Sequence, residues 1–198
     1  ISPWKGIIKS APREKVTQLS IGSAQFGMPY GVTNSKGKVP LNTVKKILEK
    51  AIGLGIQYID TAQSYGDSET ALGKSLPMGH DFKITSKFST LVSTSSNHEV
   101  VKEWEKKLHL SLEKLGVSKL HSLLLHNSLE LNQVDSKILF NWLRSIRERG
   151  LVDYIGASIY VESDLDFLPL NEIQIVQLPL SIYDQRHLQN GTIKKLNE

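Results

Sequence analysis

The stretch IQYIDTAQSYGDSE, residues 56–69, joins a short apolar run to a polar loop that holds an acid and a phenol. Asp60 stands at the end of the apolar run, and Tyr65 follows in the loop, directly before Gly66. In parallel α/β folds, residues at the carboxyl ends of strands and in the loops after them form the active site. The stretch therefore predicts a buried strand that ends in a carboxylate and presents a tyrosine to the same pocket.

The composition indicates a folded domain that binds neither nucleic acid nor a membrane. Of its 198 residues, 39% are hydrophobic and 22% are charged, which suits a globular protein. The net charge of +4 is mild, and because the lysines are interleaved with glutamates we interpret them as solvated helix surface. No run approaches the roughly 20 apolar residues of a membrane-spanning helix. The absence of cysteine excludes disulfides and thiolate metal sites, and the histidines lack metal-like spacing. We predict a cytoplasmic protein with no metal site.

Short apolar runs alternate along the chain with longer segments of helical periodicity. The runs predict strands at Gln18–Ala24, Gln57–Asp60, Lys83–Lys87, Leu120–His126, Tyr154–Ser158 and Ile173–Leu178. The periodic segments predict helices at Leu41–Leu54, with Asn42 as its cap, and at Ser68–Leu76, Asn97–Leu115, Val134–Arg149 and Glu162–Leu168. Such alternation favours a parallel α/β architecture.

Two closures of a parallel sheet are open to this pattern, a doubly wound sheet and a barrel. A doubly wound dinucleotide fold should show Gly-x-Gly-x-x-Gly after its first strand, but residues 22–27 read GSAQFG. Polar and ionisable residues at the strand ends favour the TIM (β/α)8 barrel instead. Such a barrel takes about 250 residues. We therefore predict a single barrel domain over residues 1–198, incomplete at the C-terminus, with about the first six β/α units present. Since the chain also lacks an initiating Met, we expect a longer parent protein.

Four residues after successive strands could act together: Asp60, Tyr65, Lys87 and His126. A lysine ammonium beside a tyrosine favours the phenolate and lowers the pKa of the phenol, while a buried carboxylate would hold the lysine charged. A histidine could donate a hydrogen bond to a substrate oxygen. The set suits protonation of a carbonyl oxygen as hydride reaches the carbon, and because side chains supply no hydride, a nicotinamide cofactor is implied. Taken singly, each residue also has a structural explanation: a capping Asp, a loop tyrosine, a solvated lysine and a core histidine.

Several stretches resemble the aldo-keto reductase superfamily, and they occur in that family's order. They are GSAQFG at 22–27, DTAQSYGDSE at 60–69, ITSK at 84–87, LLLH at 123–126, IGAS at 155–158 and VQ at 176–177. The resemblance implies a (β/α)8 barrel that binds NADP(H) and reduces a small-molecule carbonyl substrate, an aldehyde, ketone or sugar, to an alcohol. It implies that Tyr65 is the general acid, that Lys87 tunes it, that Asp60 pairs with Lys87, and that His126 orients the carbonyl.

The resemblance also implies a set of cofactor-binding residues: Gly22, Ser23, Asp60, Ser158 and Gln177. Gly22 and Ser23 fall where the first loop approaches the cofactor, and Ser158 and Gln177 match residues that hold the nicotinamide carboxamide. Family members carry Asn directly after that serine, whereas this chain has Ile159. The family's phosphate-recognition segments and its nicotinamide-stacking aromatic lie in the last two strand–loop units, which follow the six predicted here.

The leading hypothesis is therefore an NADP-dependent reductase in which Tyr65 supplies the proton. The first alternative is a catalytically weak NADP(H)-binding or sensing protein on the same barrel, which the Ile159 substitution motivates. The second alternative is a structural or interaction module. Rapid catalytic turnover would exclude the first alternative, and specific dinucleotide binding argues against the second.

Overall fold

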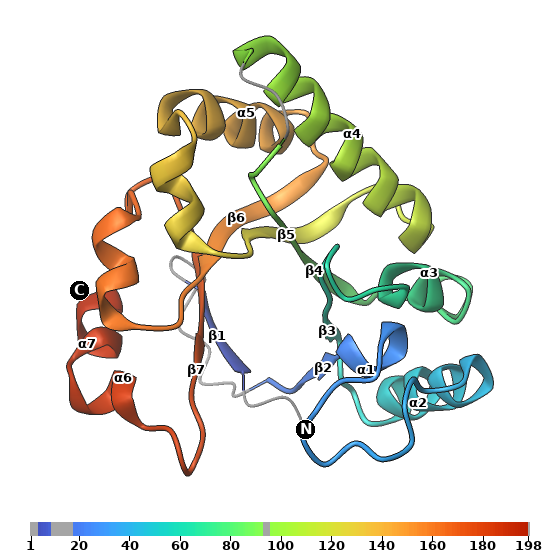
Figure 1. Ribbon diagram of the computed structural model, residues 1–198. Coiled ribbons are helices and arrows are strands. Elements are labelled where there is room, and N and C mark those ends of the chain that lie inside the picture. The colour runs from blue at the N-terminus through green and yellow to red at the C-terminus, as the bar shows by residue number, and fades with distance from the viewer. Residues whose placement is uncertain (1–3, 9–17, 93–95, 198) are drawn as a thin grey trace.

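The computed structural model describes residues 4–8, 18–92 and 96–197, which build one curled sheet with helices on its outer side (Figure 1). The strands are β1 (Trp4–Ile8), β2 (Ser20–Gly22), β3 (Tyr58–Asp60), β4 (Lys83–Phe88), β5 (Leu120–Leu125), β6 (Val152–Ser158) and β7 (Ile175–Pro179). The helices are α1 (Ala24–Gly27), α2 (Leu41–Gly53), α3 (Ser68–Gly73), α4 (Asn97–Leu115), α5 (Ser136–Glu148), α6 (Arg186–Gln189) and α7 (Thr192–Asn197), with 3-10 helices η1 (Ser128–Gln133) and η2 (Glu162–Phe167).

The six parallel strands β2 to β7 confirm the predicted α/β fold, a partial barrel with six strands of the (β/α)8 pattern. The strand order in the sheet is β1-β7-β6-β5-β4-β3-β2, so each strand from β2 to β7 lies beside its neighbour in sequence. The register sets Asp60 beside Thr85 and Lys87 beside Leu124, and it sets Ser158 beside Gln177. Because all six strands are parallel, their carboxyl ends, which carry polar residues, lie at the same end of the curled sheet.

Strand β1 was not predicted from the sequence. It pairs antiparallel with β7, with Trp4 opposite Pro179 and Ile8 opposite Ile175. A pairing across about 170 residues leaves no local pattern to detect, since the partner is chosen by the tertiary fold. The strand covers the edge of β7 that would otherwise expose unpaired backbone groups.

The outer face of the sheet packs against the long helices. In α4, the buried residues Trp104, Leu108, Leu112 and Leu115 recur every three or four positions, so one stripe faces the sheet. The rings of Phe88 on β4 and Trp142 on α5 lie 5.4 Å apart between centroids, and Trp104 lies 5.5 Å from Trp142. Gly116, at φ 67°, ends α4 in the left-handed conformation that glycine adopts most readily. This packing fixes the strands whose ends carry the candidate site.

Several sequence predictions differ from the structure in the bounds, the cap or the type of an element, and most of the shifts are by one to three residues. The first strand is shorter than Gln18–Ala24, because Ala24 already begins α1. The helix expected over Val134–Arg149 begins at Ser136, where Asp135 caps it by accepting from the amides of Lys137 and Ile138. Asn42 lies inside α2 and does not cap it; the N-cap is Pro40, whose carbonyl accepts the first amides. The segment expected as an α-helix over Glu162–Leu168 is the 3-10 helix η2.

Candidate active site

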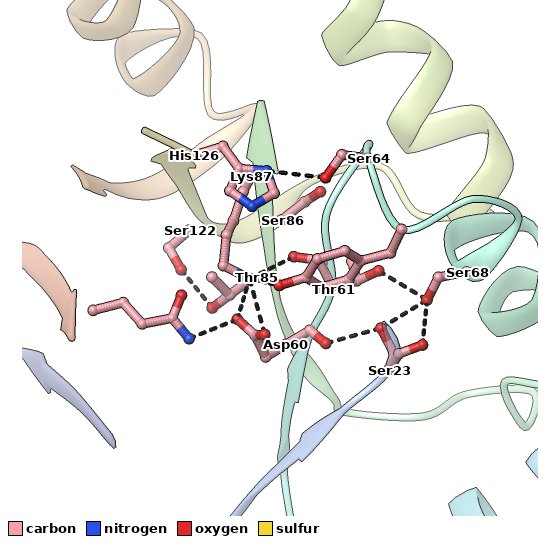
Figure 2. Close-up of polar contacts among 12 residues, drawn as sticks. Ser23, Asp60, Thr61, Ser64, Ser68, Thr85, Ser86, Lys87, Ser122 and His126 are labelled. Atoms are coloured by element: carbon pink, nitrogen blue, oxygen red, sulfur yellow. Dashed lines mark hydrogen bonds and ion pairs between the residues drawn. The ribbon is translucent and has the colours of Figure 1, made fainter. Parts of the chain in front are cut away.

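Four side chains meet at the carboxyl ends of the strands. Three of them, Asp60, Lys87 and His126, are labelled in Figure 2. Asp60 is the last residue of β3 and Lys87 the penultimate residue of β4. His126 directly follows β5, and Tyr65 lies in the loop between β3 and α3. Figure 2 shows Lys87 between His126 and Asp60, with its contacts directed at the carboxylate. The sequence expectation that these residues share one place in the fold agrees with this geometry.

Lys87 is the centre of the cluster. Its Nζ donates to both carboxylate oxygens of Asp60, at 2.7 and 2.8 Å, and to the backbone oxygen of Thr61 at 3.0 Å. The hydroxyl of Tyr65 lies 3.3 Å from the same nitrogen. Lys87 is only 2% exposed and Asp60 only 8%, so neither charge is offset by bulk water. A buried lysine is tolerated when a carboxylate and further acceptors surround it, as they do here.

The electrostatics of this cluster correct one sequence expectation. Lys87 was expected to lower the pKa of Tyr65, but burial and the nearby charge of Asp60 raise that pKa above its usual range. Burial also lowers the pKa of Lys87, and the attraction of Asp60 opposes this without cancelling it. The negative charge of Asp60 thus compensates for the positive charge of Lys87 at the phenol. Tyr65 is consequently a protonated phenol at neutral pH, in contact with an ammonium.

His126 faces the ring of Tyr65. The two rings meet edge to face, with centroids 5.8 Å apart, and the His126 Nδ1 lies 3.0 Å from the hydroxyl of Ser64. Burial lowers the pKa of His126, and the positive charge of Lys87 lowers it further. His126 is therefore neutral at pH 7, with one ring nitrogen as donor and the other as acceptor. Ser64 was not singled out from the sequence, and an exposed loop serine 62 residues from its partner carries no local signal.

The loop that carries Tyr65 is held by close backbone packing and by side-chain hydrogen bonds. A Cβ on Gly27 would lie 1.8 Å from the backbone oxygen of Tyr65, so only glycine fits beside it. Gly66, at φ +56°, lies against the backbone oxygen of Gly27 in the same way. Below them, the buried hydroxyls of Ser23 and Ser68 lie 2.7 Å apart, and Ser23 donates to the backbone oxygen of Asp60 at 2.8 Å. The turn after β2 thus fixes the positions of both Asp60 and Tyr65.

Two buried carboxylates that sequence inspection passed over support the neighbouring loops. Glu130 on η1 accepts from the hydroxyl of Ser89 and from the amide and hydroxyl of Thr90, at 2.6–3.0 Å. Glu69 on α3 accepts from Ser86 at 2.7 Å and from Ser111 at 3.1 Å. A capping-type contact to a loop 40 residues away has no signature in the sequence. Glu130 thus holds the loop after β4 in place, and Glu69 joins α3 to β4 and α4.

Comparison with known proteins identifies the family. The sequence profile described as "Aldo/keto reductase family" matches residues 18–198. The chain belongs to this family. The aldo-keto reductase resemblance inferred from the motifs is thereby confirmed, and members of the family generally use a nicotinamide cofactor and act on small-molecule carbonyl compounds.

Solved structures of other aldo-keto reductases share this fold. The holo form of an enzyme from Bacillus halodurans has a TM-score of 0.67 at 18% identity, covering 90% of this chain and 58% of its own. A thermostable enzyme in complex with the inhibitor epalrestat has a TM-score of 0.68 at 21% identity, covering 96% and 68%. The Bombyx mori enzyme in complex with NADP has a TM-score of 0.54 at 20% identity, covering 76% and 49%.

At these identities the likeness concerns the fold. The chain spans 58% of the length of the Bacillus halodurans enzyme and 49% of the Bombyx mori enzyme. No curated protein sequence matches the chain significantly.

One of the two residues expected to hold a nicotinamide carboxamide contacts Asp60, and the other lies beside it in the sheet. Gln177 on β7 is 6% exposed and donates from Nε2 to the Asp60 carboxylate at 3.1 Å. Its Oε1 is buried and has no hydrogen-bond partner among the described residues. Ser158, 1% exposed, stands beside it in the register of β6 and β7. An unused amide oxygen beside a buried hydroxyl fits a ligand that brings an N–H donor, as a carboxamide does.

Ile159 differs from the asparagine expected at its position. Its side chain is fully buried, and its backbone amide donates to the backbone oxygen of Gln177 at 2.8 Å. Neither its side chain nor its N–H is therefore available to a cofactor. Any carboxamide contact at this point depends on Ser158 and Gln177.

Sites of two other kinds are absent from residues 4–8, 18–92 and 96–197. No three His, Asp or Glu side chains of this part lie so as to share a metal ion. None of its helices is long and apolar enough to cross a membrane.

Proposed function

We propose that this protein is an NADP-dependent carbonyl reductase in which Tyr65 is the general acid. The observation that carries the proposal is the buried contact of Lys87 with both Asp60, at 2.7 Å, and Tyr65, at 3.3 Å. A buried ammonium that touches a protonated phenol is an arrangement suited to giving away a proton and stabilising the phenolate that remains. Its placement at the carboxyl ends of parallel strands supports an active site there.

In this mechanism Tyr65 protonates the carbonyl oxygen while a hydride adds to the carbonyl carbon. Bound NADPH would supply the hydride, so that the carbonyl becomes an alcohol and the cofactor leaves as NADP⁺. Because the pKa of Tyr65 is raised, the phenol carries its proton before the reaction. The phenolate formed then lies 3.3 Å from the Lys87 ammonium, which stabilises it until it is reprotonated.

Asp60 acts on Lys87, which lies beside the proton donor, and His126 acts on the carbonyl oxygen, which accepts the proton. Asp60 keeps Lys87 charged despite its burial, because the attraction of the carboxylate raises the pKa of Lys87 against the effect of burial. His126 is neutral, since its pKa is lowered by burial and by Lys87, so it offers one N–H to the carbonyl oxygen. We assign to Gln177 and Ser158 the binding of the nicotinamide carboxamide, and to Gly22 and Ser23 the approach of the first loop to the cofactor.

The test is to replace Tyr65 by phenylalanine in the complete protein. Loss of the hydroxyl should lower kcat for NADPH-dependent carbonyl reduction by about 10²-fold or more, since positioned acid–base groups contribute roughly 10²–10⁴-fold. NADPH affinity, measured by fluorescence titration, should change little because the ring remains. Tyr183→Phe is the matched control, since Tyr183 is fully exposed. Equal turnover in Tyr65→Phe and Tyr183→Phe would remove Tyr65 from the role of acid.

Ile159 favours one second candidate, a protein that binds NADP(H) with little turnover. Its buried side chain and its occupied amide leave fewer groups to orient the nicotinamide ring. In that case NADPH quenches or shifts the fluorescence of the complete protein, while no carbonyl in a panel of aldehydes, ketones and sugars is reduced. Turnover with any of these compounds at ordinary enzyme rates, about 1 s⁻¹ or faster, excludes this candidate.

A further inference from the structure

The contact between Ser64 and His126 joins an exposed loop residue to a ring nitrogen of the candidate site. Ser64 is an exposed residue of the loop after β3, and its hydroxyl lies 3.0 Å from the Nδ1 of His126 (Figure 2). Within the described part of the chain, no other group hydrogen-bonds to either ring nitrogen of His126. The backbone of His126 is held separately, because its amide donates to the backbone oxygen of Phe88 at 2.9 Å. The serine therefore acts on the ring alone.

We propose that Ser64 is a positioning residue that donates its hydroxyl proton to Nδ1 and so holds His126 in the tautomer with its proton on Nε2. This inference rests on the proposed function, in which His126 must donate to the carbonyl oxygen. A neutral imidazole has one N–H and one lone pair, and the bond made by one nitrogen selects what the other can do. With Ser64 as donor, Nε2 carries the N–H that a carbonyl oxygen accepts.

The opposite tautomer would oppose the reaction. If Nδ1 carried the proton and donated to Ser64, Nε2 would direct a lone pair at the carbonyl oxygen. Two acceptors facing each other repel, so the carbonyl would lose the hydrogen bond that polarises it. A hydroxyl can take either role, but only its role as donor leaves a catalytically useful ring.

The charged groups around His126 affect its pKa. Burial is the largest cause and lowers this pKa, Lys87 on β4 lowers it further, and Glu130 on η1 and Asp60 on β3 raise it without reversing the direction. Tyr65 contributes the edge-to-face ring contact. Ser64 is uncharged and can accept from an imidazolium as readily as it donates to a neutral ring. Its removal should therefore change the tautomer and leave the pKa of His126 nearly unchanged.

The experiment is ¹⁵N NMR of the complete protein labelled at histidine, in the wild type, Ser64→Ala and Ser64→Thr. The ¹⁵N shifts of the ring nitrogens distinguish a protonated from an unprotonated nitrogen, and the signals of His126 are those lost in His126→Asn. We expect the wild type and Ser64→Thr to carry the proton on Nε2. We expect Ser64→Ala to show a mixture of tautomers, with the titration midpoint of His126 unchanged.

The kinetic consequence follows from the loss of one hydrogen bond. In Ser64→Ala, kcat for carbonyl reduction should fall by about 3- to 10-fold, since one net hydrogen bond is worth roughly that factor. KM for NADPH should not change, and Ser64→Thr should restore kcat. The acid limb of the pH profile should keep its midpoint, which separates this effect from a shift in the pKa of His126.

The outcomes separate this inference from the proposed function. A single Nε2–H tautomer in Ser64→Ala, or an Nδ1–H tautomer in the wild type, overturns the role of Ser64 whatever the activity. A tautomer mixture in Ser64→Ala supports it even if the wild type reduces no carbonyl, in which case only the proposed function fails. A loss of kcat that Ser64→Thr does not restore also contradicts it, because the hydroxyl would then not be the active feature.

Discussion

Replacing Asp60 by asparagine removes the only carboxylate that contacts Lys87 among the described residues, and leaves the shape of the site unchanged. Lys87 would then be a buried, unpaired charge, since it is only 2% exposed. Breaking a buried ion pair by removing one partner costs about 3–5 kcal/mol. The cost has a ceiling, because Lys87 can lose its proton instead. From an ordinary lysine pKa near 10.4, neutralisation at pH 7 costs about 5 kcal/mol at about 1.4 kcal/mol per pH unit. The two values agree, so we expect a loss of about 3–5 kcal/mol.

The sign of the pH dependence is specific to this cause. In Asp60→Asn, the folded-state pKa of Lys87 falls further below its unfolded value, so the unfolded chain binds the proton more tightly. Stability then rises with pH wherever the unfolded state holds more protons. The loss relative to the wild type should therefore be largest near pH 7 and should shrink as the pH rises toward 10.

The assay is thermal and denaturant unfolding of the complete protein, followed by circular dichroism at several pH values. The melting temperature at pH 7 should fall by roughly 6–20 °C, at about 2–4 °C per kcal/mol for a domain of this size. The double variant Asp60→Asn/Lys87→Met removes both charges and should lose less than Asp60→Asn alone, since no unpaired charge remains. A loss below about 1 kcal/mol at pH 7, or one that does not change with pH, would refute the reasoning.

Three further predictions concern the loop, the cofactor and the pH profile. Gly27→Ala should lower kcat, and it should lower the free energy of unfolding by about 1–3 kcal/mol, because the added Cβ would lie 1.8 Å from the backbone oxygen of Tyr65. Gly53→Ala is the control in thermal unfolding and should not destabilise the protein, because its Cβ would have no atom within 4 Å. Gln177→Leu should weaken NADPH binding by about 3- to 10-fold in a fluorescence titration, the value of one hydrogen bond, and unchanged affinity would argue against a carboxamide contact. In a profile of kcat/KM against pH, the midpoint of the acid limb should lie below the ordinary histidine value of about 6.5, because the pKa of His126 is lowered and the neutral ring is the active form. A midpoint above about 6.5 would contradict this.

The parts of the fold that were predictable are those with a local signal. Helix α4 was predicted with its observed bounds, because its apolar stripe and the glycine after it both mark the element. The start of α5 was missed although Asp135-Ser136 is a capping signal, since the apolar periodicity of the segment was extended back past it. Strand β1 had no such signal, because its pairing with β7 depends on the rest of the sheet.

The same division holds within the site. Asp60, Tyr65, Lys87 and His126 could be grouped because each follows a predicted strand, and parallel strands bring their carboxyl ends together. The direction of the pKa shift of Tyr65 could not be predicted, because it is set by burial and by the charge of Asp60. Such effects are decided by distances and burial rather than by the order of residues in the chain.

The most direct test of the central claim is isotope transfer from the cofactor. The complete protein is incubated with NADPH deuterated at the hydride position and with a panel of aldehydes, ketones and sugars, and the alcohols are analysed by mass spectrometry. The account predicts an alcohol that carries one deuterium on the former carbonyl carbon, formed at least about 10²-fold more slowly by Tyr65→Phe. An alcohol without deuterium, or no alcohol from any compound while NADPH binds tightly, would contradict the claim that this site reduces carbonyls by hydride transfer.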